Sequence, residues 1–238
     1  MSFGTPQQLS LSVNLSDDAT FENFYAAPGS RNAEVLAALR HQVEQPDHSV
    51  IYIWGAQGVG LSHLLQAGCH YAQNRGLAIQ YLPLTELSAA GPDDVFSDLE
   101  TLDYVALDDV DAIVGKSDWE FGLFKLYNHL RDHNKRLVMA ARKNVHELPL
   151  KLEDLRSRLH WGLIYQVESL TDEDKCCALQ ARARARGLDL GEEVAHYLIQ
   201  RLPRHTHDLF RQLHQLDCAS LAEQRKLTIP FVKKTLDL

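Results

Sequence analysis

Short apolar runs alternate with longer mixed stretches over the first 170 residues of the chain. The apolar runs are rich in β-branched and aromatic residues and predict buried strands at residues 49–54, 77–82, 104–107, 136–141 and 163–167. The longer stretches predict helices at residues 32–45, 61–75 and 118–133, the first ending before Pro46 and the second at Gly76. Strands that alternate with helices are typical of a parallel sheet with helices on both faces, so we predict an α/β fold.

The pattern changes near residue 170. From Thr171 onward it is entirely helical, with Thr171 as a helix N-cap, acidic residues in the first turn and Gly187 as the stop of that helix. We therefore predict three regions. They are a flexible polar tail over residues 1–19, an α/β domain over residues 20–170 and a small all-helical domain over residues 171–238.

Composition and charge narrow the classes of function. Hydrophobic residues make up 45% of the chain and charged residues 24%, as in a globular protein with a real core. No apolar run approaches the roughly 18 residues of a membrane helix, and the N-terminus lacks the regions of a signal peptide. We expect a cytoplasmic protein that makes no membrane contact. The net charge of −8 opposes unassisted binding to a nucleic-acid backbone.

A glycine-rich loop links the first predicted strand to the helix after it. Residues 55–62, Gly-Ala-Gln-Gly-Val-Gly-Leu-Ser, match the phosphate-loop spacing except at Leu61, where a lysine is expected. The backbone N–H groups of such a loop and of the following helix form a nest for anions. That lysine neutralises phosphates during transfer, so we expect nucleotide binding without efficient hydrolysis. The candidate nucleotide contacts here are Gly55, Gly58, Val59, Gly60, Leu61, Ser62 and His63.

An acidic pair, Asp108 and Asp109, follows the third predicted strand. Ligands of open α/β sheets bind at the carboxyl ends of such strands. If Mg²⁺ is bound, Asp108 would hold it through water and Ser62 would offer its hydroxyl. Asp109 would occupy the water-polarising position of the catalytic machinery. Each motif alone is also compatible with a simple turn, but their order and their places after strands favour a nucleotide site.

Several segments together resemble the ATPase domain of the bacterial replication initiator DnaA, an AAA+ protein. They are residues 20–24 (Thr-Phe-Glu-Asn-Phe), the glycine loop, residues 157–162 (Ser-Arg-Leu-His-Trp-Gly) and residues 224–233. The resemblance spans about residues 20–238 and is greatest to the short homologues that switch the initiator off. It implies an AAA+ domain with a helical lid, bound ADP and Phe24 at the base-binding edge. It also implies that no DNA-reading domain follows.

The resemblance assigns an arginine finger to Arg158, with Arg156 as the weaker candidate. Such a residue stabilises charge on the phosphoryl group of a neighbouring subunit's nucleotide, which needs the planar, permanent charge of arginine. From spacing alone, a surface ion pair of Arg158 with Glu153 or Asp154 is the simpler interpretation. With the resemblance taken into account, the arginine finger becomes the preferred interpretation of Arg158.

Three phosphate-facing positions depart from the family pattern. Leu61 replaces the loop lysine, Ala140 and Ala141 followed by Arg142 replace a polar residue on the fourth strand, and His207 aligns with a lid arginine. A site poor in cations suits two phosphates better than three. His207 is either a pH-dependent cation for the phosphates or an exposed lid histidine.

Residues 8–13, Gln-Leu-Ser-Leu-Ser-Val, resemble the short motif with which such homologues bind the sliding clamp of DNA polymerase III. The amide of Gln8 offers a bidentate contact, and alternating apolar residues fit a groove. The apolar anchors are Leu9, Leu11 and Val13. Without the resemblance, the segment reads as an ordinary polar tail.

Two further patterns have simple structural interpretations. We expect Arg182, Arg184 and Arg186 to form a solvated basic face. The predicted helix at residues 118–133 carries an apolar stripe at helical spacing, which we expect to face the core. It consists of Phe121, Phe124, Tyr127 and Leu130.

The hypothesis is a regulator that binds a nucleoside diphosphate, docks on the DNA-loaded clamp and lends Arg158 to ATP-bound DnaA. DnaA then hydrolyses its own ATP, and DNA is contacted only through the clamp. We expect no independent turnover. The rivals are a stand-alone weak P-loop NTPase and a clamp-bound adaptor without arginine chemistry, and self-association stays open.

Overall fold

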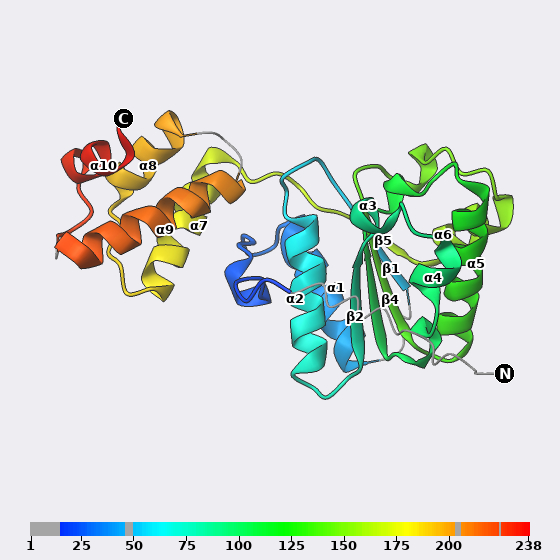
Figure 1. Ribbon diagram of the computed structural model, residues 1–238. Helices are drawn as coiled ribbons and strands as arrows, with labels where there is room; N and C mark the ends of the chain where they lie inside the picture. Colours follow the sequence, from blue (N-terminus) through cyan, green and yellow to red (C-terminus); the bar gives the residue numbers. More distant parts are fainter. Residues whose placement is uncertain (1–14, 46–49, 203–205, 224) are drawn as a thin grey trace, which may run out of the picture.

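The computed structural model describes residues 15–45, 50–202, 206–223 and 225–238, which form an α/β domain and a helical lid (Figure 1). The domain is built on five parallel strands in the order β2-β3-β4-β1-β5. Their bounds are β1 Val50–Trp54, β2 Ile79–Pro83, β3 Tyr104–Asp108, β4 Arg136–Ala141 and β5 Leu163–Gln166. The parallel sheet confirms the predicted fold class, and each strand lies within two residues of its predicted bounds.

Helices cover both faces of the sheet (Figure 1). Alternate strand residues point to opposite faces, so Tyr52 joins one apolar cluster while Ile51 and Ile53 join the other. One face is covered by α1 Arg31–Glu44 and α2 Leu61–Gln73. The other face is covered by α3 Leu84–Leu87, α4 Pro92–Phe96, α5 Ser117–Asp132 and α6 Glu153–Trp161. The sequence pattern did not predict α3, α4 or α6.

The apolar pattern predicted to face the core lies on α5, and only part of it is buried. Tyr127 and Leu130 are buried as predicted, but Phe121 is 51% exposed, and Lys125 lies 4.4 Å from the centre of its ring. The prediction for Phe121 is wrong because the partners that bury α5 cover less than the full apolar stripe. Within the described residues, the helices are all too short or too polar to cross a membrane.

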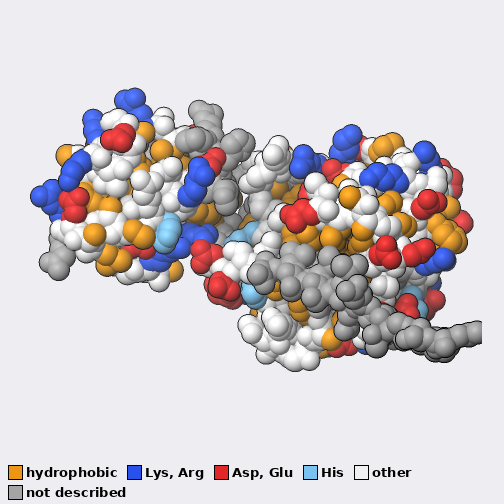
Figure 2. Space-filling model, viewed as in Figure 1, with side chains coloured by type: hydrophobic (Ala, Val, Ile, Leu, Met, Phe, Trp, Pro, Cys, Tyr) orange, Lys and Arg blue, Asp and Glu red, His pale blue; other side chains and the backbone are white. Residues whose placement is uncertain are grey.

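The lid contains α7 Asp172–Ala185, α8 Glu192–Arg201, α9 Thr206–Glu223 and α10 Ile229–Leu236. It has a core of its own, in which Leu179, Leu198 and Leu216 are fully or almost fully buried. The predicted N-cap is confirmed, because Thr171 forms a capping box with Asp174. On the face shown in Figure 2, the lid and the α/β domain are two masses joined at a narrow waist.

Gly68 lies in the middle of α2 because the ring of Tyr104 fills the space beside it. A Cβ at this position would overlap the Tyr104 hydroxyl. That hydroxyl is buried and has no hydrogen-bond partner within the described part of the chain. Substitution would therefore have to displace a fully buried ring in a packed interior.

We predict that Gly68→Ala lowers the free energy of unfolding by about 1–3 kcal/mol, since overpacking outweighs the helix propensity of alanine. Urea unfolding followed by circular dichroism measures this change. Adding Tyr104→Phe should recover part of the loss, because it removes the overlapping oxygen. Gly91→Ala is the control, because its nearest atom lies 3.5 Å from the new Cβ. Equal stability of Gly68→Ala and Gly91→Ala would contradict this account of the packing.

Candidate nucleotide-binding site

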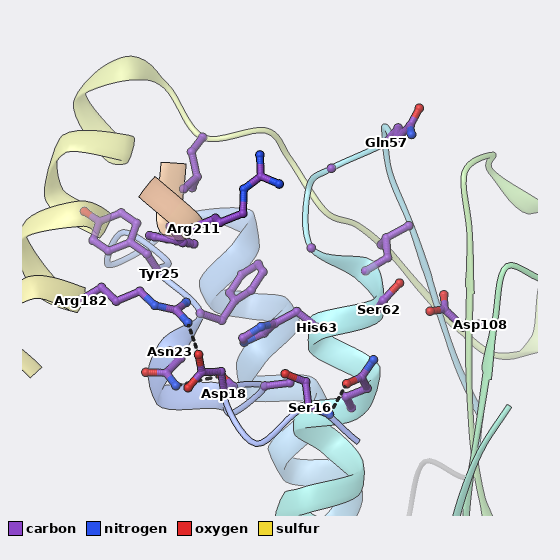
Figure 3. Close-up of a pocket in the computed structure, with 18 of the residues that line it drawn as sticks. Ser16, Asp18, Asn23, Tyr25, Gln57, Ser62, His63, Asp108, Arg182 and Arg211 are labelled. Atoms are coloured by element: carbon purple, nitrogen blue, oxygen red, sulfur yellow. Dashed lines mark hydrogen bonds and ion pairs between the residues drawn. The ribbon is translucent and has the colours of Figure 1, made fainter. Parts of the chain in front are cut away.

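A cavity of about 700 Å³ lies between the carboxyl edge of the sheet and the lid. Figure 3 shows Ser62 and Asp108 on its domain side, and Arg182 and Arg211 reaching in from the lid. The size is within the range of about 300–1,000 Å³ that is usual for small-molecule sites. The structure thus brings the glycine loop and the acidic pair together at one cavity, along with Phe24 and His63.

The glycine loop has the backbone conformation that a phosphate nest needs. Gly58 and Gly60 have φ of +84° and +100°, in the left-handed region that favours glycine. A Cβ on Gly60 would lie 2.9 Å from the Phe24 ring, and one on Gly55 would lie 2.5 Å from the Val167 carbonyl oxygen. The loop is therefore held against its neighbours at both ends.

Helix α2 presents an uncapped N-terminus to the cavity. It begins at Leu61, and its N-cap, Gly60, offers no side-chain hydrogen bond. The first-turn N–H groups of a helix have no partner within the helix and carry the positive end of its dipole. Leu61 and Ser62 both line the cavity at this point. Phosphate oxygens fit this end of the cavity, where the backbone supplies donors and partial positive charge.

The side chain of Leu61 adds no charge to the loop. It is partly buried and packs against the apolar cluster beneath α1 and α2, to which Phe24 and Val59 also belong. Residues 55–62 contain neither lysine nor arginine. Any cation for the phosphates must therefore come from outside the loop.

Asp108 is a buried carboxylate at the end of β3, only 3% exposed. It accepts hydrogen bonds from the Tyr81 hydroxyl at 2.7 Å and from the Asp109 backbone N–H at 2.9 Å. Burial raises the pKa of Asp108, and hydrogen bonds from Ser62 and Tyr81 offset only part of this rise. The hydroxyl of Ser62 and the Asp108 carboxylate are thus close together, as a shared Mg²⁺ would require.

Asp109 has φ of +51°, which is unusual for a residue with a side chain. Its carboxylate accepts a hydrogen bond from the Thr85 hydroxyl at 3.0 Å, and Arg142 Nη2 lies 4.0 Å from its other oxygen. These contacts hold the Asp109 carboxylate next to Arg142, and both residues line the cavity.

Aromatic side chains line the cavity beside the loop, where the Phe24 ring lies against Gly60 and His63 follows Ser62 in the first turn of α2. The rings of Phe24 and His63 lie 5.9 Å apart between centres, and Tyr25 also lines the cavity. His63 Nε2 is 2.8 Å from the Thr20 carbonyl oxygen, to which a neutral ring donates. Burial lowers the pKa of His63, so this ring is neutral near pH 7. Flat, uncharged side chains of this kind suit a nucleobase.

Two lid arginines, expected on a solvated face, instead form an ion-pair network with Asp18. The carboxylate of Asp18 lies 3.3 Å from Arg182 Nη2 and 3.4 Å from Arg186 Nη2. Both arginines line the cavity and are largely buried, because residues four apart share one face of α7. Only Arg184 stays on the exposed side, so the expected solvated face is wrong for the other two.

The segment before residue 20 contributes to this site. The Ser16 N–H donates to the Gln66 side chain on α2 at 2.9 Å, and the Ser16 carbonyl contacts His70 Nε2 at 3.1 Å. Asp18 then bridges to the lid (Figure 3). The sequence carries no local signal for this bridge, since the partners are far apart along the chain.

Arg158 lies on α6, outside the lining of the cavity. Its guanidinium stacks 4.5 Å from the centre of the Trp161 ring, and Trp161 is 67% exposed. Glu153 pairs with Arg156 at 3.4 Å, and Arg158 forms no ion pair with any residue that the structure describes. The simple surface pair with Glu153 or Asp154 is therefore absent from the described residues.

The other predicted site residues are only partly described. His207 falls within α9, but its side chain lies outside the described structure. The predicted clamp-binding residues, Gln8, Leu9, Leu11 and Val13, also lie outside the described residues. Arg211, on the next turn of α9 after His207, lines the cavity and was missed by the sequence analysis.

Comparisons with known proteins agree with this architecture. The family model of the bacterial DnaA ATPase domain matches residues 15–166, and that of the Hda lid domain matches residues 172–236. The fold and the family matches together define an AAA+ protein with a helical lid. More narrowly, the chain belongs to the family of the bacterial DnaA ATPase domain.

Solved structures of similar shape support the fold. Domain III of the Thermotoga maritima replication initiation protein DnaA is 23% identical, with a TM-score of 0.76 over 94% of this chain and 98% of that one. AMPPCP-bound DnaA from Aquifex aeolicus is 22% identical, with a TM-score of 0.72 over 84% and 65%. The Thermotoga maritima RuvB branch-migration motor is 15% identical, with a TM-score of 0.67 over 92% and 71%. At these identities the likeness concerns the fold alone.

We predict that Asp108→Asn raises the melting temperature of the nucleotide-free protein at pH 7. The raised pKa means that ionised Asp108 costs folding free energy, while asparagine keeps an acceptor for the Asp109 N–H and can donate its amide N–H to the Tyr81 oxygen, which reverses that hydrogen bond. The free energy of unfolding of the wild type therefore falls as pH rises from about 4, the ordinary aspartate pKa, through the raised pKa of Asp108, because the buried carboxyl must then ionise. The difference should therefore shrink toward pH 4.

Differential scanning fluorimetry between pH 4 and pH 8 measures this effect without added Mg²⁺. Asp189→Asn is the control, since Asp189 is exposed. A melting temperature of Asp108→Asn below that of wild type at pH 7 would show that the carboxylate is stabilising, against the argument from burial.

Proposed function

We propose that this protein is a regulator of replication initiation that stimulates ATP hydrolysis by DnaA and so inactivates the initiator. The observation that carries the proposal is the placement of Arg158. This arginine is free of ion pairs among the described residues, lies on an exposed tryptophan and does not line the chain's own cavity. Membership of the DnaA ATPase-domain family supplies the context.

The nucleotide site of this chain suits binding better than turnover. The N–H groups of the loop and of α2 would hold the phosphates, and Phe24 and His63 would hold the base. Ser62 and Asp108 would hold Mg²⁺, which supplies charge neutralisation between phosphate oxygens when bound. With Leu61 in the loop, we propose a nucleoside diphosphate, most simply ADP, as the resident ligand.

Arg158 would act on a second nucleotide, that of a bound DnaA molecule. Stacking on Trp161 fixes the plane of the guanidinium, which reduces the conformational entropy lost when it meets a phosphoryl group. An arginine supplied in trans accelerates such hydrolysis by roughly 10³–10⁵. The exposed indole beside it offers the aromatic anchor that protein interfaces favour. Self-association through the same surface would cover Arg158 until DnaA displaces the second copy.

The proposed organisation follows from these roles. The clamp-binding motif would form a tail before Ser16 and Asp18, which pack against α2 and the lid, with the AAA+ domain over residues 20–170 and the lid over residues 171–238. The tail would dock the protein on the sliding clamp of DNA polymerase III, so DNA is reached indirectly. We place this activity in the cytoplasm.

A second candidate is a stand-alone weak NTPase. It is favoured by the acidic pair at the cavity, where Thr85 and Arg142 orient Asp109. ATP turnover by the purified protein alone tests this candidate, with Asp109→Asn as the variant that should abolish it. Turnover that Asp109→Asn removes, without any effect on DnaA, would favour the NTPase over the regulator.

We predict that Arg158→Ala reduces stimulation of DnaA by about 10³-fold or more, because the charge on the phosphoryl group loses its partner. ATP hydrolysis is followed with ATP-loaded DnaA, sliding clamp and DNA. Melting temperature and ADP affinity should not change. Arg156→Ala is the matched comparison: it breaks a contact to the Leu150 carbonyl oxygen at 2.6 Å and should lower stability but keep stimulation. Full stimulation by Arg158→Ala would leave the clamp-bound adaptor as the better explanation.

We predict that replacing Gln8 and the three apolar anchors with alanine weakens binding to the sliding clamp by about tenfold or more, because the amide contact and the groove contacts are lost. The replaced residues are Gln8, Leu9, Leu11 and Val13. Surface plasmon resonance on immobilised clamp measures the affinity. The control replaces Ser10 and Ser12, which alternate with the anchors. Equal loss in the control, or no loss in the variant, argues against the motif.

A further inference from the structure

Two histidine rings face each other outside the cavity, next to the helix end that carries Arg158. His146 lies in the short helix η4, Val145–Glu147, and His160 lies in the last turn of α6. His146 Nδ1 and His160 Nε2 are 2.9 Å apart, and the planes of the two rings meet at an angle of 70°. Neither ring lines the cavity, so the pair has no part in the nucleotide site.

The hydrogen bonds of His160 fix the position of its proton. Its Nδ1 lies 2.6 Å from the carbonyl oxygen of Arg156, four residues earlier on α6. A carbonyl oxygen can only accept, so a neutral His160 ring carries its proton on Nδ1 and keeps a lone pair on Nε2. That lone pair faces His146, whose Nδ1 donates to it in the neutral pair. Histidines that bind metal ions are usually held in the same way, by a bond from the other ring nitrogen to a carbonyl or carboxylate oxygen.

The two facing nitrogens are almost as far apart as two nitrogen ligands of one zinc ion. Zinc lies about 2.0–2.1 Å from each histidine nitrogen, and tetrahedral coordination then puts the two nitrogens about 3.3 Å apart. The rings therefore need to separate by only about 0.4 Å to admit the ion between them. His146 is exposed, so its proton can move from Nδ1 to Nε2 through water when the ion arrives.

A second pair of histidines shows why the angle between the rings matters. His129 lies on α5 and His133 is its C-cap, with ring centres 4.1 Å apart and only 18° between the ring planes. A metal ion binds an imidazole nitrogen along its lone pair, in the plane of the ring. The lone pairs of such stacked rings run side by side. Those of His146 and His160 converge, because their rings are steeply inclined to each other.

We propose that His146 and His160 bind Zn²⁺. Neutral imidazole nitrogens suit zinc and its neighbours in the first transition row, whereas magnesium and calcium require oxygen ligands. Over the residues that the structure describes, no group of three or more metal-ligating side chains is present, so water completes the coordination of the ion. The ion joins η4 to the last turn of α6, which also carries Arg158 and Trp161.

Calorimetric titration of the purified protein with Zn²⁺ tests the site in matched variants. His146→Asn is the main variant, because its amide can still donate to His160 Nε2 while it is a poor zinc ligand. Its melting temperature without zinc should stay close to that of wild type. Its zinc affinity should fall at least about tenfold, since even the partners of metal ligands contribute that much. His160→Ala should show the same loss of affinity, and His133→Ala, from the stacked pair, should show none.

Two further measurements locate the ion. Zinc should shift the NMR signals of His146 Nδ1 and His160 Nε2, and it should protect the last turn of α6 from hydrogen exchange in wild type but not in His146→Asn. Zinc bound at the exposed thiols of Cys177 and Cys218 would persist in every variant, so the difference between variants is what counts. Unchanged zinc affinity of both His146→Asn and His160→Ala overturns the proposal. An equal loss in His133→Ala, or shifts confined to other histidines, overturns it as well.

Discussion

The tight turn from β1 into α2 is the constraint on which the rest of the site depends. Gly55 faces the Val167 carbonyl and Gly60 faces the Phe24 ring at distances that leave no room for a Cβ. The turn therefore holds together three separate parts of the chain, and it aims the uncapped end of α2 into the cavity. Because this helix end offers N–H donors at a fixed place, the cavity suits an anionic ligand.

Positive charge is distributed in an unusual way around this turn. The loop has none, the lid provides Arg182, Arg186 and Arg211, and α6 holds Arg158 away from the cavity. Charge on the lid acts only when the lid is near the domain, whereas charge on α6 is open to another molecule. On the proposed function, the arginines near the chain's own nucleotide would thus differ from Arg158, which would act on the nucleotide of a partner.

Local signals in the sequence predicted much of this structure, and long-range contacts account for the rest. The strands, the glycine loop and the Thr171 N-cap are encoded by neighbouring residues, so their prediction was accurate. Helices α3 and α4, of four and five residues, are too short to show a period. The Asp18–Arg182 bridge joins residues 164 apart, and no local pattern reveals such a partner. For the same reason, the place of Arg211 emerged only from the fold.

The Asp18 bridge also changes the mechanics of the lid. Among the described residues, the lid is joined to the domain by the peptide chain before Thr171, by the ion pairs of Asp18 with Arg182 and Arg186, and by the contact of Tyr25 with Cys177. The non-covalent contacts restrict the rotation that a single peptide linker would allow. The second attachment is ionic, and the Asp18 side chain is 62% exposed. Dissolved salt screens such a contact, so a rise in ionic strength loosens this attachment of the lid and leaves the uncharged contacts in place.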